Sequence, residues 1–99
     1  MQTKQRSGVR LLRRLKVLMG GEIGFTADVT ANGFCVETRR LAQPGTSLSG
    51  TITLDDREFA FTGMVCWARA MEEMGRMGVR FLDIPREFQA RFADAAHSH

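Results

Sequence analysis

Residues 28–33, Asp28-Val29-Thr30-Ala31-Asn32-Gly33, form the polar stretch around which the rest of the sequence is organised. Two strand-like runs flank it, Phe25–Val29 before and Phe34–Thr38 after. Asn-Gly between such runs predicts a tight β-hairpin, because glycine tolerates a positive φ and the close approach of other atoms. Asp28 and Thr30 lie two residues apart, so on an extended strand both side chains point to the same side. The stretch therefore predicts a hairpin that presents a carboxylate and a hydroxyl together.

The hairpin belongs to a series of short strand-like segments separated by turn residues. Alternation of apolar and polar residues predicts six strands, at Arg14–Met19, Ile23–Val29, Gly33–Thr38, Ser47–Leu54, Arg57–Ala70 and Arg76–Leu82. Gly63, in the middle of the longest one, predicts a β-bulge or a sharp bend. Strands without intervening helices predict an antiparallel barrel or sandwich, and a closed barrel would leave no strand edge exposed.

One α-helix is expected after the last strand, over Arg86–Ala96. Phe88 and Phe92 recur at helical spacing and would lie against the strands. Asp83 is a candidate N-cap, and Pro85 suits the first turn.

Four further side chains are expected inside the fold. Phe61 and Trp67 share one face of the longest strand and are predicted to lie in the core. Cys35 and Cys66 lie in apolar strand-like runs and are predicted to be buried thiols. Their spacing indicates neither a metal site nor a disulfide framework.

Positive charge is concentrated at the N-terminus of this 99-residue chain, whose net charge is +3. No acidic residue precedes Glu22, and the basic residues before it are Lys4, Arg6, Arg10, Arg13, Arg14 and Lys16. Such a block is typical of a solvated arm or of an anion-binding segment. We therefore divide one domain, residues 1–99, into a flexible basic arm (1–13), a barrel (14–83) and the C-terminal helix (85–96).

The sequence gives little support for catalysis, metal binding or membrane insertion. Histidines occur only at His97 and His99, so a Ser-His or Cys-His site has no candidate and we expect no enzyme. No apolar run approaches the roughly 20 residues that span a bilayer. Basic residues interrupt the N-terminal leucines, which argues against a signal peptide. We therefore expect a cytoplasmic binding protein without a metal ion or cofactor.

The arm and several other short segments together resemble a known family. Arg6-Ser7-Gly8-Val9-Arg10 has the form RxxxR, and residues 28–33 have the form DxTxxG. The sequence also contains Pro44-Gly45, Gly63-Met64-Val65-Cys66-Trp67 and Met77-Gly78-Val79-Arg80-Phe81. Each motif is weak alone, but their order and spacing resemble the PilZ domain over about Arg6 to Phe92.

The resemblance implies a six-stranded antiparallel β-barrel that binds the bacterial second messenger cyclic di-GMP. It assigns Arg6 and Arg10 to the phosphates and guanine edges, and Asp28 to the guanine N–H donors. It also implies that Thr30 and Gly33 complete the turn against the ligand. Arginine forks and a carboxylate complement this dianion with two guanines. We expect binding to order the arm and to change contacts with an unidentified effector protein in motility or biofilm signalling.

Three features depart from the usual family pattern. Arg10 to Arg14 also has the form RxxxR. We prefer Arg6 and Arg10, because the first strand then follows at the family's usual distance, and we keep Arg14 as a further candidate. Thr30 stands where the motif has serine, and Gln5 stands where many members carry another arginine.

Two other functions are weighed against the receptor. One is a PilZ-fold adaptor that has lost ligand binding and acts through protein contacts in motility or pilus control. The other is a nucleic-acid binder that uses the basic arm. No aromatic RNA-binding pattern is present and the charge is confined to one end, so we expect no DNA or RNA partner.

Overall fold

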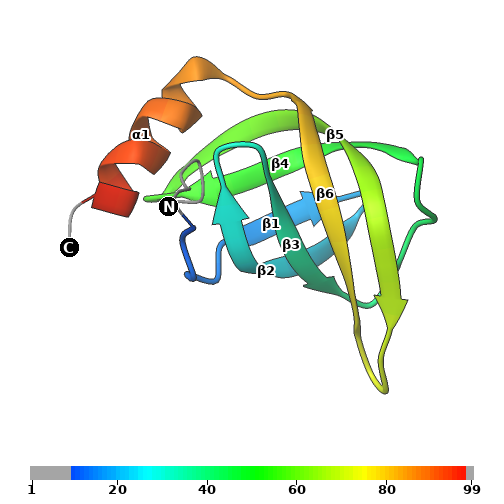
Figure 1. Cartoon of the computed structure of the whole chain (residues 1–99). Helices are drawn as coiled ribbons and strands as arrows, with labels where there is room; N and C mark the ends of the chain where they lie inside the picture. The colour runs from blue at the N-terminus through cyan, green and yellow to red at the C-terminus, as the bar shows by residue number, and fades with distance from the viewer. Residues whose placement is uncertain (1–9, 98–99) are drawn as a thin grey trace, which may run out of the picture.

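The structure, a computed structural model, describes residues 10–97. Segments with alternating apolar side chains form six antiparallel strands in it. The strands are β1 Lys16–Met19, β2 Glu22–Thr30, β3 Gly33–Thr38, β4 Ser47–Leu54, β5 Arg57–Ala70 and β6 Gly75–Asp83. They follow the order β1-β2-β3-β6-β5-β4 around a closed barrel, in which β4 pairs back to β1 (Figure 1). The expected six-stranded antiparallel barrel is confirmed, although β1 begins at Lys16 and not at Arg14.

The β2–β3 hairpin has a two-residue loop, Ala31-Asn32, immediately before Gly33. A Cβ at Gly33 would lie 2.1 Å from the carbonyl oxygen of Val79, so only glycine lets β3 approach β6 this closely. The N–H of Phe81 donates to the carbonyl of Asn32 at 2.8 Å and fixes the loop against β6. Of the two reasons expected for a glycine at position 33, close approach is confirmed. A positive φ is wrong, because Gly33 lies outside the left-handed region.

A β-bulge in β2 decides where Asp28 points. The pairing with β3 shifts between Thr26 and Asp28, so one extra residue enters β2 there. Thr26 and Val29 are both completely buried although they lie three residues apart, because the bulge reverses the inward and outward alternation. Asp28 and Thr30 consequently lie on the outer face, on the same side as expected.

A β-bulge in β5 turns Trp67 out of the barrel. The register with β6 shifts twice. The first shift lies between Thr62 and Gly63, at the mid-strand glycine, where β6 carries the extra residue. The second lies between Val65 and Trp67, where β5 carries the extra residue. Phe61 and Val65 lie inside, and Phe61 is confirmed as a core residue. Trp67 is 44% exposed, so its predicted place in the core is wrong. The second bulge is the physical reason, because it reverses the alternation that would have kept position 67 inside.

The two cysteines also lie outside the core, contrary to expectation. Cys35 faces outward from β3 between the buried Phe34 and Val36, and is only partly covered. Cys66 is the residue that the β5 bulge inserts, and it is exposed. An apolar run in a strand therefore does not place every member on the buried face, because successive side chains point to opposite faces.

The segment before β1 is held along β2. Leu11 is buried and exchanges two backbone hydrogen bonds with Val29, at 2.8 and 2.9 Å. The hydroxyl of buried Thr26 donates to the Arg13 carbonyl at 2.7 Å and accepts from the Leu15 N–H at 2.8 Å. These bonds fix the backbone next to Arg10, whereas Arg6 lies outside the described residues.

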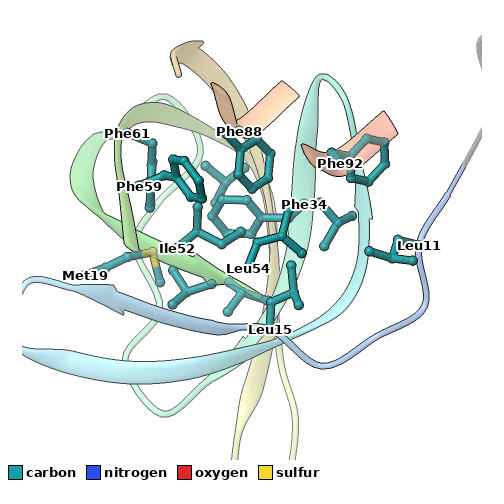
Figure 2. Packing of buried hydrophobic residues seen from close by; sticks show 14 of the residues in the cluster. Leu11, Leu15, Met19, Phe34, Ile52, Leu54, Phe59, Phe61, Phe88 and Phe92 are labelled. Atoms are coloured by element: carbon teal, nitrogen blue, oxygen red, sulfur yellow. The ribbon is translucent and has the colours of Figure 1, made fainter. Parts of the chain in front are cut away.

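Helix α1, Arg86–His97, lies across one end of the barrel (Figure 1). Its buried residues Phe88 and Phe92 point towards the core, where Phe88 contacts the ring of Phe59 at a centroid distance of 5.5 Å (Figure 2). The carbonyl of Pro85 accepts the first helical hydrogen bonds, from the N–H groups of Phe88 and Gln89. Asp83 is the last residue of β6, so its prediction as N-cap is wrong and the helix starts three residues later, at Arg86.

Candidate functional site

Strand register brings four outward-facing residues into one row across the outer face of β2, β3, β6 and β5. Asp28 pairs with Cys35, Cys35 with Gly78, and Gly78 with Trp67. The two middle residues are small, so the face is hollowed between Asp28 and Trp67. The resulting groove has a volume of about 560 Å³. This volume falls within the roughly 300–1,000 Å³ that is typical of small-molecule sites.

Trp67 forms a flat aromatic surface in this groove. A Cβ at position 78 would lie 2.2 Å from the indole Nε1, so the ring rests directly on the backbone of Gly78. An exposed indole can stack on a planar ring or on a guanidinium. Sequence reasoning missed this role because it assigned Trp67 to the core, and only the bulge reveals its orientation.

Two arginines of β6 flank Gly78, one of the four residues of this row. Arg76 and Arg80 lie two residues to either side of Gly78, and both line the groove. Arg80 pairs across the strands with Gly33, and Arg76 pairs with Glu37. Neither arginine was among the predicted site residues. The signal that could have found them is the alternation along β6, which places both on the face opposite the core residues Met77 and Val79.

Arg10 and Asp28 meet at the rim of the groove. Arg10 Nη1 lies 3.6 Å from Asp28 Oδ2, and the two side chains are 60% and 29% exposed. Both line the groove together with Thr30 and Gly33. The structure therefore brings together all the predicted binding residues that it describes except Arg14.

Thr30 has a local role as well as a place in the groove. Its hydroxyl donates to the Gly33 carbonyl at 3.4 Å and accepts from the Asn32 N–H at 3.2 Å. These bonds span the hairpin loop and fix the side-chain hydroxyl close to Asp28. Serine could make the same two bonds, so the added methyl of threonine leaves this function of the motif intact.

Arg14 does not line the groove and is connected to it only through Glu37. Its Nη1 donates to Glu37 Oε1 at 3.0 Å, and its guanidinium lies 5.5 Å from the centroid of the Phe25 ring. Glu37 Oε2 in turn accepts two hydrogen bonds from Arg76, at 2.7 and 3.0 Å. Arg14, Glu37 and Arg76 therefore form a chain that leads from the segment before β1 to the groove.

Electrostatics favour an anion in the groove. Arg10, Arg76 and Arg80 face a single lining carboxylate, Asp28. Hydrogen bonds from Arg14 and then from Arg76 lower the pKa of Glu37, and the hydrogen bond to Glu37 raises the pKa of Arg76. Burial, followed by the charge of Asp28, raises the pKa of the Cys35 thiol, so this thiol stays neutral. The arrangement can bind an anion that also carries planar rings and N–H donors.

Neither a metal-ligand cluster nor a membrane-spanning helix is found among residues 10–97. No three His, Cys, Asp or Glu side chains gather there as metal ligands would. No helix between residues 10 and 97 is long and apolar enough to cross a membrane.

Comparison with known proteins agrees with the fold and with the family that the motifs resemble. The PilZ domain matches residues 3–95 of the sequence. This chain belongs to the PilZ domain family. PilZ domains are a family of cyclic di-GMP receptors, and the resemblance drawn from the motifs is confirmed.

This PilZ domain is also similar to a solved structure, the Bacillus subtilis inhibitor of motility (MotI/DgrA). The TM-score is 0.82 at 20% sequence identity. The likeness covers 95% of this chain and 50% of the other, so this PilZ domain spans about half the length of that protein. At such identity the likeness supports the fold. No curated protein matches the sequence significantly.

Proposed function

We propose that this PilZ domain binds cyclic di-GMP in the groove between Asp28 and Trp67. The observation that carries the proposal is the convergence of an arginine, a carboxylate and an exposed indole around one groove. Arg10 and Asp28 belong to the RxxxR and DxTxxG motifs, and Trp67 ends the Gly63–Trp67 segment that also carries the family resemblance. A receptor that acts by binding needs no catalytic residue.

Each part of the ligand has a chemical partner in the groove. The Asp28 carboxylate accepts hydrogen bonds from guanine N–H donors, and the guanidinium of Arg10 complements a phosphate or the O6/N7 edge of guanine. A guanine face can stack on Trp67, a contact that is worth about 1–3 kcal/mol for a base on an aromatic side chain. The groove therefore complements the charge, the hydrogen-bond donors and the flat rings of the ligand.

The basic arm supplies the second motif arginine, Arg6. We propose that it closes over the bound ligand from the side of Arg10, because Leu11 fixes the start of the described segment to Val29. Closure would change the surface that is offered to an effector protein, a binding-induced ordering of a segment. Because the ligand is an intracellular second messenger, we place the domain in the cytoplasm.

Calorimetric titration with cyclic di-GMP at physiological salt tests the proposal, with GTP and cyclic di-AMP as ligand controls. We expect saturable binding of cyclic di-GMP that Asp28→Ala weakens. Asp94→Ala is the matched control, because Asp94 is an exposed carboxylate on α1, away from the groove. Equal affinity of the wild type for all three nucleotides would contradict the proposal.

A ligand-free adaptor is the second candidate, and one surface favours it. Leu18 and Ile23 pair directly across β1 and β2, and they are 42% and 53% exposed. Phe25, 38% exposed, extends the same outer face. An apolar face of this kind suits a protein contact. A folded protein that binds none of the nucleotides would favour the adaptor.

A further inference from the structure

Arg76 differs from Arg10 in how a carboxylate holds its guanidinium, because Arg10 forms only a 3.6 Å ion pair with Asp28 whereas Arg76 makes two hydrogen bonds to Glu37. Its Nε and Nη2 atoms both donate to Glu37 Oε2, at 3.0 and 2.7 Å. Glu37 lies directly opposite on β3, so the strand register itself sets this pair. A guanidinium has five N–H donors, and two of them serve Glu37. The remaining donors allow Arg76 to bind an acceptor in the groove without releasing the carboxylate.

Glu37 is itself held in place from the other side. Arg14 Nη1 donates to Glu37 Oε1 at 3.0 Å, so each carboxylate oxygen has an arginine partner. The Glu37 side chain is only 22% exposed. The guanidinium of Arg14 lies over the Phe25 ring, which restricts its movement as well. The Arg14–Glu37–Arg76 network is therefore a fixed support at one end of the groove.

Fixing an arginine before a ligand arrives favours binding. A long side chain loses rotamer freedom when it is immobilised, and this loss opposes association. A guanidinium that is already oriented by a neighbouring carboxylate has lost that freedom in the free protein. The same carboxylate weakens the positive field, so the two effects of Glu37 on an anionic ligand have opposite signs.

We propose that Arg76 is a phosphate-binding residue of the cyclic di-GMP site and that Glu37 is its positioning residue. This assignment rests on the proposed function. It places a third guanidinium at the end of the groove remote from Arg80, since Arg76 and Arg80 lie on opposite sides of Gly78. The network also gives Arg14 an indirect part in binding, as the residue that holds Glu37.

Calorimetry with cyclic di-GMP on the full chain tests the assignment. We expect Arg76→Ala to weaken binding about tenfold, the effect of losing a charge-assisted hydrogen bond. Arg76→Lys should also weaken binding, because lysine keeps the charge but lacks the fork that serves Glu37 and the ligand together. Arg69→Ala is the matched control, since Arg69 pairs with Arg76 from β5, is exposed and does not line the groove.

Glu37→Gln separates positioning from charge. This variant removes one negative charge, so electrostatics alone would tighten the binding of an anion. A positioning role predicts severalfold weaker binding instead. Tighter or unchanged binding by Glu37→Gln would overturn the role of Glu37.

The remaining outcomes decide between this assignment and the proposed function. Equal effects of Arg76→Ala and Arg69→Ala in a wild type that binds the ligand would overturn the assignment of Arg76 alone. A wild type that does not bind cyclic di-GMP would overturn the proposed function, and the assignment with it. Both arginines lie on the outer face, and thermal unfolding would verify that each variant is folded.

Discussion

At the scale of single residues, the site depends on where a few charged side chains are held. Arg10 lies next to Asp28, whereas Arg14 lies next to Glu37, although both arginines come from the same basic segment. The sequence contains two overlapping RxxxR patterns and offers no direct way to choose between them. In the structure, the Leu11–Val29 pairing fixes the position of Arg10, and this long-range contact is not visible in the sequence.

The two arginines are expected to differ when each is removed. Arg10→Ala should abolish detectable binding of cyclic di-GMP, because it removes a guanidinium that lines the groove. Arg14→Ala should weaken binding less, because it acts only through Glu37. Affinities of the two variants, measured side by side, check this prediction. Equal losses would mean that the second RxxxR register is in use.

Glu37 predicts a pH dependence of stability. Hydrogen bonds from Arg14 and Arg76 hold its pKa below the value in the unfolded chain. A group of this kind stabilises the fold fully above its unfolded pKa, and the stabilisation is lost as pH falls through the folded pKa. The wild type should be more stable than Glu37→Gln at neutral pH, and this difference in stability should shrink as the pH falls into the acidic range. Thermal unfolding midpoints that keep a constant difference would contradict this.

At the scale of elements, two bulges separate what the sequence could predict from what it could not. Alternation correctly predicted β5 and the core position of Phe61. It wrongly predicted Trp67, because one inserted residue reverses the alternation of everything after it. The bulge in β2 acts in the same way on Asp28. Gly63 indicated one irregularity, but no residue pattern revealed the other two.

Phe61 and Trp67 on the same strand should therefore respond differently to truncation. Phe61→Ala removes a core ring and should lower the free energy of unfolding by about 3–5 kcal/mol. Trp67→Ala should change stability less and weaken cyclic di-GMP binding, because the indole lies in the groove. Chemical denaturation and calorimetry measure the two effects. Loss of stability without loss of affinity in Trp67→Ala would contradict the assigned role.

Helix α1 stabilises the end of the barrel through its aromatic face. Phe88 is completely buried and lies 5.5 Å from Phe59 and 5.6 Å from Phe81, measured between ring centroids. Phe88→Ala should lower the free energy of unfolding by about 3–5 kcal/mol. Gln89→Ala, at an exposed neighbouring position, is the control and should have little effect. A small effect of Phe88→Ala in chemical denaturation would mean that the helix is only loosely attached.

At the scale of the whole molecule, the closed barrel provides the face on which, in our proposal, the basic arm closes when the ligand binds. The number and order of strand-like segments were sufficient to predict an antiparallel barrel or sandwich, because each strand alternates over most of its length, and the family resemblance specified the barrel. The groove could not be predicted, because its row of Asp28, Cys35, Gly78 and Trp67 depends on the register of four strands. The predicted binding residues were found by resemblance, whereas the places of Arg76, Arg80 and Trp67 in the groove required the structure.

The chain contains a single tryptophan, so fluorescence reports directly on the groove. The most direct test is a titration with cyclic di-GMP that follows Trp67 fluorescence, with GTP and cyclic di-AMP as controls. We expect a saturable change with cyclic di-GMP alone, which Asp28→Ala weakens and Asp94→Ala leaves unchanged. A folded protein whose Trp67 emission does not respond, whether or not calorimetry detects binding, would contradict the proposal that this groove is the ligand site.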